Sequence, residues 1–281
     1  MLKTILTALR SPDLRKKLLF TAFILAVYRF GSYVPVPGID LAALQEAIDQ
    51  RGSRLLDFLN LFAGGALTRF AVFALGIMPY ITASIILQLM TVVIPSLEKL
   101  QKEGESGQQK ITQYTRYFTV VLALLQSMAY VLYFRSQDAL PQFSAGRFYL
   151  IVISVTAGTV LLMWLGELIT QRGVGNGISL LIFASIVSSV PDAVDGWLTL
   201  PPVSQVLILT IALGVVVGVV FINEGQRRIP IQYAKRVVGR RQTSGGTTYM
   251  PLRVNMAGVI PVIFAPSVGI LPPTLAEVGG Q

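Results

Sequence analysis

An uncharged run between Phe70 and Leu97 constrains this chain more than any other feature of its sequence. A helix that crosses a bilayer needs roughly 20 mostly apolar residues, and this run is long enough. It nevertheless contains Gly76, Pro79 and Gln88. Such residues are tolerated at membrane depth where neighbouring helices or a wet cavity satisfy the backbone groups that they free. The run therefore predicts a span that faces a cavity, although a kinked structural span would give the same pattern.

A short amphipathic piece, Arg54 to Phe62, precedes this run and ends at Gly64 and Gly65. Glycine permits backbone angles that other residues avoid, so this piece has the freedom to fold back toward the same cavity. The alternative is a surface helix at the foot of the span.

Composition places the whole chain in the class of multispan membrane proteins. Hydrophobic residues make up 53% of it, charged residues only 13%, and the mean hydropathy is +0.65. The absence of His and Cys excludes the zinc, haem and thiol chemistries that use those ligands. We predict an all-α, multispan transmembrane helical bundle with no catalytic residue, no metal site and no cofactor.

Seven apolar runs predict seven spans. They are residues 18–34, 70–97, 117–134, 148–169, 178–190, 203–222 and 254–271. The fifth run has the length of a buried or re-entrant segment, unless helical ends beyond it lengthen the helix. The glycine-rich stretch 171–177 before it superficially resembles a phosphate loop. Its neighbours are apolar helices rather than a strand and a helix, so we interpret it as a tight turn.

The distribution of Lys and Arg predicts the orientation. If the connections alternate between the two sides, most of the 23 Lys and Arg residues lie on the side of the N-terminal head. The positive-inside rule then places the N-terminus in the cytoplasm. The connection 224–253 holds seven cations and one acid. That density suits anionic lipid headgroups or a polyanionic partner, while a solvated cytoplasmic loop is the default interpretation.

Several strings of residues resemble one family in its order. They are FALGIMPYI (73–81), KEGESG (102–107), QYTRY (113–117), MWLGE (163–167), GVGNGIS (173–179), YAKR (233–236) and NMAGVIP (255–261). From about Leu18 to its end, the chain resembles the SecY family, the channel subunit of the bacterial-type Sec protein translocon. The resemblance implies a non-enzymatic hourglass channel that passes unfolded secretory proteins across the membrane and releases transmembrane segments laterally into lipid. The family has ten spans in two inverted halves, so we expect an N-terminal portion truncated after the seventh span.

The resemblance also implies a domain organisation. Residues 1–17 are expected to form a cytoplasmic amphipathic head. Residues 18–190 would form the first five-helix half, including a plug at 55–66 that closes the outer funnel. Residues 191–281 would begin the second half, with the basic loop 224–253 and the seventh span 254–271.

Pore and plug residues follow from the same resemblance. The implied apolar pore ring comprises Ile77, Ile81, Ile182, Ile186 and Ile263. The implied plug residues are Leu55, Leu56, Phe58, Leu59, Phe62, Gly64 and Gly65. Residues at i and i+4 share one helix face, which fits the paired isoleucines. Ordinary packing would explain these isoleucines equally well without the resemblance.

Gate and partner residues are implied as well. The polar cluster of the lateral gate would comprise Thr82, Gln126 and Asn255. The residues that would contact the ribosome or the SecA motor ATPase are Arg228, Lys235, Arg240 and Arg241. Further implied partners are the SecE and SecG subunits, signal peptides, nascent secretory or membrane proteins, and the lipid bilayer. The simplest location is a bacterial plasma membrane, and a thylakoid membrane is the alternative.

Two other classes of protein were weighed. A secondary transporter would also have broken helices, but it should carry an ionisable site inside the membrane. The span interiors offer only Arg29, which we expect to snorkel toward the interface. An intramembrane hydrolase would need a placed base or metal ligands. No P-loop is present, so energy for transport would come from a partner.

Overall fold

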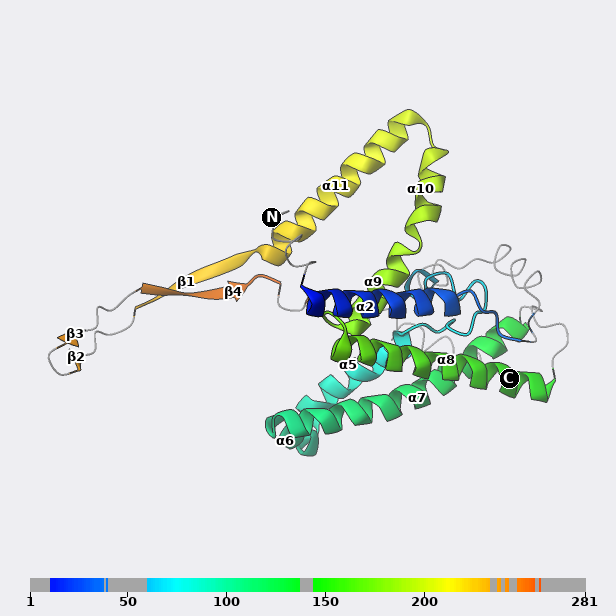
Figure 1. The fold of residues 1–281 in the computed structure, drawn as a ribbon, viewed down its shortest axis with the longest axis horizontal. Helices are drawn as coiled ribbons and strands as arrows, with labels where there is room; N and C mark the ends of the chain where they lie inside the picture. Colours follow the sequence, from blue (N-terminus) through cyan, green and yellow to red (C-terminus); the bar gives the residue numbers. More distant parts are fainter. Residues whose placement is uncertain are drawn as a thin grey trace. The chain divides into compact units, whose positions relative to one another are not determined.

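A computed structural model describes residues 11–37, 39, 60–136, 144–232, 237–238, 241–242, 247–255 and 258. The chain divides into two compact units, Met1–Ala193 together with Phe264–Gln281, and Val194–Ile263. The described part of the first unit is built from helices, and the second contains a long helix and a β-ribbon (Figure 1). The predicted helical bundle is confirmed, with strands added in the basic connection.

The helices of the first unit pack in a chain of neighbours. They are α2 (Pro12–Gly31), α5 (Met78–Val93), α6 (Pro95–Lys102), α7 (Glu105–Ser136), α8 (Ala145–Arg172) and α9 (Gly177–Val187). Helix α7 packs against α5 and α8, and α8 packs against α2 and α9. Phe134, Ile151, Leu162 and Leu181 are fully buried between them. Close van der Waals packing of such side chains holds membrane helices together, since lipid is as apolar as they are.

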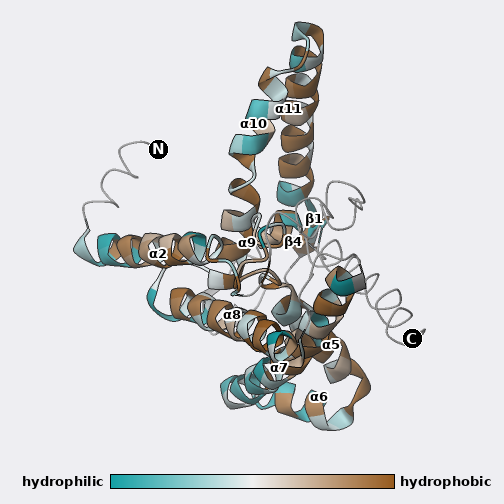
Figure 2. Ribbon diagram, turned by 90° about the vertical axis from the view of Figure 1, so that its right-hand side faces the viewer, coloured by the Kyte–Doolittle hydropathy of each residue, from teal (hydrophilic) through white to brown (hydrophobic). Residues whose placement is uncertain are grey.

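Four described helical segments are long and apolar enough to cross a membrane. They are Glu105–Arg135, Ala145–Arg172, Gly177–Leu198 and Pro202–Glu224, and the bent pair α5–α6 makes a fifth if it counts as one span. Helix α2 is not among them, because basic residues at 15–17 and Arg29 crowd both of its ends. The predicted seventh span has only residues 254, 255 and 258 described. Hydrophobic residues cover most of α11 (Pro202–Glu224), none of which is buried (Figure 2).

The second predicted span begins later than the apolar run does. Residues 64–77 form turns, and helix begins only at Met78. Gly76 has a φ of +57°, and Pro79, which lacks an N–H, lies in the first helical turn where none is needed. The helix ends at Ile94, which is extended because it precedes Pro95, and α6 continues at 101° to α5. The bend that the alternative of a kinked structural span would require lies at the end of this helix rather than in its interior.

The fifth predicted span is longer than its apolar run. Helix α9 is followed by α10 (Val190–Leu198), and the combined segment Gly177–Leu198 has 22 residues. Pro191 does not stop this span, because it lies in the first turn of α10. The extension beyond the run therefore replaces the re-entrant alternative.

The basic connection contains a β-ribbon rather than only loop. Strand β1 (Gln226–Gln232) pairs antiparallel with β4 (Thr247–Arg253), so that Ile229 lies opposite Met250. The two-residue strands β2 (Val237–Val238) and β3 (Arg241–Gln242) pair farther out. The prediction of a loop rested on the charge count alone. Strands β1 and β4 also contain β-branched and aromatic residues, which favour strand.

Candidate functional site

The end of the predicted plug is buried in the first unit. Residues 60–63 are helical, and Gly64 and Gly65 then adopt φ of +64° and +80°. Phe62 and Ala63 are only 7% and 2% exposed. The predicted plug residues Leu55, Leu56, Phe58 and Leu59 lie outside the described residues. The break predicted at the glycine pair is present.

Helix α2 supplies two side chains to this segment. The Tyr28 hydroxyl lies 2.5 Å from the Ser185 hydroxyl of α9 and 3.5 Å from the Ala63 carbonyl oxygen. The Arg29 guanidinium donates to the Gly64 carbonyl at 3.0 Å and, through its other nitrogen, to the Tyr33 hydroxyl at 2.7 Å. Arg29 was expected simply to snorkel. It instead bonds a backbone carbonyl next to the left-handed turn.

Residues that follow the plug are held by backbone hydrogen bonds. Val36 donates to the Phe70 carbonyl at 3.0 Å, and Val72 donates to the Val34 carbonyl at 2.9 Å. These bonds make a short antiparallel bridge between Pro35 and Ala71. The stretch 70–72 is therefore fixed to the segment that leaves α2.

Two arginines flank Tyr33 on the surface. The guanidinium carbons of Arg29 and Arg69 lie 4.7 and 4.2 Å from its ring centroid. The pairing keeps Arg29 anchored at the end of α2.

Four predicted pore-ring residues are described. Ile77 is 4% exposed at the start of α5, and Ile81 follows one turn later, half-buried. On α9, Ile182 is half-buried and Ile186 is 38% exposed. Ile263 lies outside the described residues. Their membership of a pore ring remains a prediction.

The end of the predicted plug lies beside both helices that carry the described residues of the predicted ring. A Cβ placed on Gly76, which precedes Ile77, would lie 3.4 Å from the Phe62 carbonyl oxygen. On α9, Ser185 directly precedes Ile186 and bonds Tyr28. The structure thus brings residues 62–64 next to the neighbours of two predicted ring positions.

The three predicted gate residues are divided between the units. Thr82 is buried and donates to the Met78 carbonyl at 3.0 Å, while Gln126 is half-buried on α7. In the second unit, Asn255 donates to Asn223 at 3.1 Å and accepts from the Gly258 amide at 3.0 Å. Thr82 and Asn255 are thus each hydrogen-bonded within their own unit, and the gate itself remains a prediction.

Of the predicted ribosome or motor contacts, Arg228 lies exposed on β1 and Arg241 lies on β3. Lys235 and Arg240 fall outside the described residues. No ion pair within the described part of the chain involves β1.

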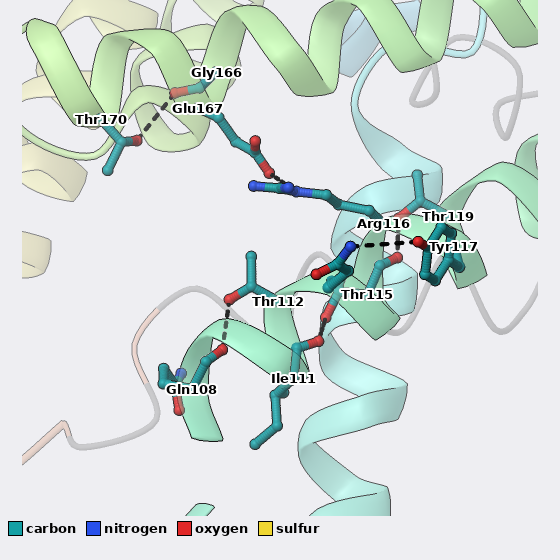
Figure 3. Close-up of polar contacts among 11 residues, drawn as sticks. Gln108, Ile111, Thr112, Thr115, Arg116, Tyr117, Thr119, Gly166, Glu167 and Thr170 are labelled. Carbon is teal, nitrogen blue, oxygen red and sulfur yellow. Dashed lines mark hydrogen bonds and ion pairs between the residues drawn. The ribbon is translucent and has the colours of Figure 1, made fainter. Parts of the chain in front are cut away.

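Sequence reasoning missed an ion pair between two helices. The Arg116 guanidinium of α7 lies 2.6 Å from the Glu167 carboxylate of α8, above a ladder of threonine hydroxyls on α7 (Figure 3). The Glu167 side chain is only 16% exposed. Arg116 lies in the string QYTRY and Glu167 in the string MWLGE. Their presence in two strings that resemble the family was the one sequence signal that could have indicated this pair.

The turn before α9 depends on one cap. The Asn176 side chain accepts hydrogen bonds from the Ile178 and Ser179 amides at 3.0 and 3.2 Å. We expect Asn176→Ala to lower the free energy of unfolding by about 1 kcal/mol, because two helix-start amides lose their acceptor. Thermal unfolding in detergent measures this change. Asn176→Ser, which keeps a capping oxygen, should remain near the parent, and equal losses in both variants would contradict the cap.

Comparison with known proteins identifies the family. A family model described as SecY matches residues 71–280. The chain belongs to the SecY family. It is 49% identical to the protein translocase subunit SecY of Streptomyces scabiei, over 100% of this chain and 68% of that protein. It is 50% identical to the same subunit of Corynebacterium glutamicum, over 99% of this chain and 66% of that protein. These relatives make it a multispan translocase channel subunit of a bacterial cell membrane, not an enzyme.

Solved structures share the fold at low identity. A protein-conducting channel superposes with a TM-score of 0.64 at 17% identity, covering 95% of this chain and 59% of that one. A SecY channel, whose plug domain stabilises its closed state and maintains a membrane seal, gives 0.61 at 17% identity over 95% and 59%. Sec61 in a canine ribosome–channel complex gives 0.61 at 17% identity over 95% and 60%. The chain spans about three fifths of these channels.

Proposed function

We propose that this chain contributes the first half and the start of the second half of a channel that passes unfolded secretory proteins across the membrane. In this proposal residues 18–190 form the first half and 191–281 begin the second. The supporting observation is the position of residues 62–64, which pack beside Gly76 of the second predicted span and bond to Tyr28 next to α9. A plug would occupy this place between the helices that carry the ring.

The ring would seal without binding the passing polypeptide. Branched aliphatic side chains at a constriction hinder water and ions by dewetting, and they offer a polypeptide no specific partner. Hydrophobic segments would leave sideways through the gate at Thr82, Gln126 and Asn255. Hydrogen bonds between membrane helices average about 0.6 kcal/mol in one measured case, which suits a gate that opens.

Partners would dock on the basic ribbon. Exposed Arg228 and three further basic residues of the same connection, Lys235, Arg240 and Arg241, would contact ribosomal RNA or an acidic surface of SecA, with the N-terminus in the cytoplasm. The related canine channel is bound in a ribosome complex, which supports the ribosome as one such partner. SecE and SecG would complete the channel, and signal peptides and nascent proteins would be its cargo.

The pore is tested by crosslinking in the full-length channel. The given 281 residues contain no cysteine, so Ile81→Cys adds the one thiol of this part of the channel, and any cysteine elsewhere in the full-length protein is first replaced by serine. With a cysteine placed in the middle of an arrested secretory polypeptide, we expect disulfide formation at Ile81→Cys. Phe23→Cys on α2, whose side chain is 64% exposed on the outside of the described helices, is the control.

A disulfide at Ile81→Cys but not at Phe23→Cys supports the pore. Absence of the Ile81 crosslink in a complex shown to hold the polypeptide would overturn the ring assignment. It would also revive the transporter alternative.

A further inference from the structure

Two side chains of α2 reach backbone carbonyls at the end of the plug. The carbonyl of Ala63 faces the Tyr28 hydroxyl, and that of Gly64 accepts from Arg29. The Ala63 carbonyl also accepts from the Ala66 amide at 3.2 Å, whereas the Gly64 carbonyl, at the left-handed turn where the short helix stops, is bonded by Arg29. An unmatched buried carbonyl is costly, so side-chain donors here hold the segment in place.

The fit around Gly64 is tight, and the fit around Gly65 is open. A Cβ on Gly64 would lie 2.9 Å from the Tyr28 hydroxyl and 3.1 Å from the Ser188 hydroxyl. No described atom lies within 4 Å of a Cβ on Gly65, which has a φ of +80°. Gly64 is therefore tightly enclosed. Gly65 has space around it and a permissive backbone, and its hinge motion has to break the bonds that its amide donates to the Asn60 carbonyl and that its carbonyl accepts from the Thr68 hydroxyl, both 3.1 Å long.

The segment beyond Gly65 is fixed. The bridge between Pro35 and Ala71 holds residues 70–72, as described above. Residues 70–72 are thus fixed, Gly65 has a permissive backbone, and residues 62–64 are held by side chains of α2. This order is that of an anchor, a hinge and a latched end.

We propose that Tyr28 and Arg29 form a latch that holds the plug closed, with Ser185 positioning the Tyr28 hydroxyl and Gly65 acting as the hinge. The inference rests on the proposed function insofar as residues 55–66 are a plug. It goes further by assigning positioning residues of the first and fifth spans to the closed state.

The latch is reversible because each of its two side chains keeps one partner after release. When residues 62–64 move away, Tyr28 keeps its bond to Ser185 and Arg29 keeps its bond to Tyr33. The carbonyls of Ala63 and Gly64 move toward water. Opening therefore loses a few hydrogen bonds without burying a bare charge, so a passing polypeptide can drive it.

The test measures how often the resting plug opens. In a full-length channel freed of any other cysteine, Ala63→Cys places one thiol where the parent residue is 2% exposed, and a water-soluble maleimide labels it only after displacement. If opening is fast compared with labelling, the labelling rate is proportional to the open population. The full-length channel in proteoliposomes is used, and ion conductance of the idle channel is measured in parallel.

Tyr28→Phe removes the hydroxyl but keeps the ring, which stacks on Phe73 with centroids 6.0 Å apart. We expect the labelling rate to rise about threefold, the effect of one modest hydrogen bond between membrane helices. Arg29→Gln should raise it about tenfold, because a charge-assisted bond is stronger. Arg29→Lys, which cannot hold Gly64 and Tyr33 with two separate nitrogens, should fall between the parent and Arg29→Gln.

Two conservative changes away from the latch are the controls. Tyr149→Phe on α8 (63% exposed) and Ser179→Ala on α9 (exposed) should label at the parent rate. Rates for Tyr28→Phe and Arg29→Lys equal to these controls would overturn the latch, even if Arg29→Gln does not fold. The labelling assay uses resting protein alone. The latch can thus fail while the Ile81 crosslink persists, and the crosslink can fail while the latch stands.

Discussion

Gly158→Ala is expected to destabilise the first unit by about 3 kcal/mol, in the upper part of the range for inserting an atom into a packed core. The added Cβ would lie 2.0 Å from the Val72 carbonyl oxygen and 2.8 Å from its carbon. These are backbone atoms, so no rotamer change relieves the overlap. Val72 is also tied to Val34, and α8 would have to move outward. Thermal unfolding of the full-length protein in detergent measures the loss.

Gly146→Ala, in the same helix, is the matched control. No described atom lies within 4 Å of the Cβ that it would add. Alanine is favoured over glycine in helices by up to about 1 kcal/mol, so this variant should be neutral or slightly more stable. Similar losses in the two variants would show that close approach to Val72 is not what requires Gly158.

The contact between Gly158 and Val72 also shows which part of the fold the sequence did not predict. Apolar runs located α7, α8 and α11, because a span must be long and uncharged whatever it packs against. They did not show that residues 70–77 precede the helix, because hydropathy treats Gly76 and Pro79 as members of the run. The local signals were present in the positive φ that glycine permits and in proline's preference for a first helical turn.

Contacts distant in sequence were beyond prediction. The glycine pair at 64–65 predicted where the short helix ends, but nothing in the sequence indicated that Tyr28 and Arg29 would bond its carbonyls. Ser185 lies 157 residues from Tyr28 along the chain. Such pairs depend on how the helices pack, which periodicity in one helix does not encode. The pore ring and gate came from the family resemblance alone.

The Arg116–Glu167 pair supplies the second large effect. We expect Arg116→Ala to lower the free energy of unfolding by about 2 kcal/mol, between the values for exposed and fully buried pairs. The reason is that the Glu167 carboxylate, 16% exposed, would keep its charge without a partner. Glu167→Gln should cost only about 1 kcal/mol, because its amide oxygen still accepts from the guanidinium.

The exposed pair Lys102–Glu98 is the control, since its atoms are also 2.6 Å apart while its side chains are 74% and 49% exposed. Lys102→Ala should cost about 0.5 kcal/mol or less, because solvent screens this pair. The double variant Arg116→Met with Glu167→Leu should be more stable than Arg116→Ala alone, since neither charge then remains. If the double variant is the less stable of the two, the pair itself, rather than the cost of a lone carboxylate, holds α7 to α8.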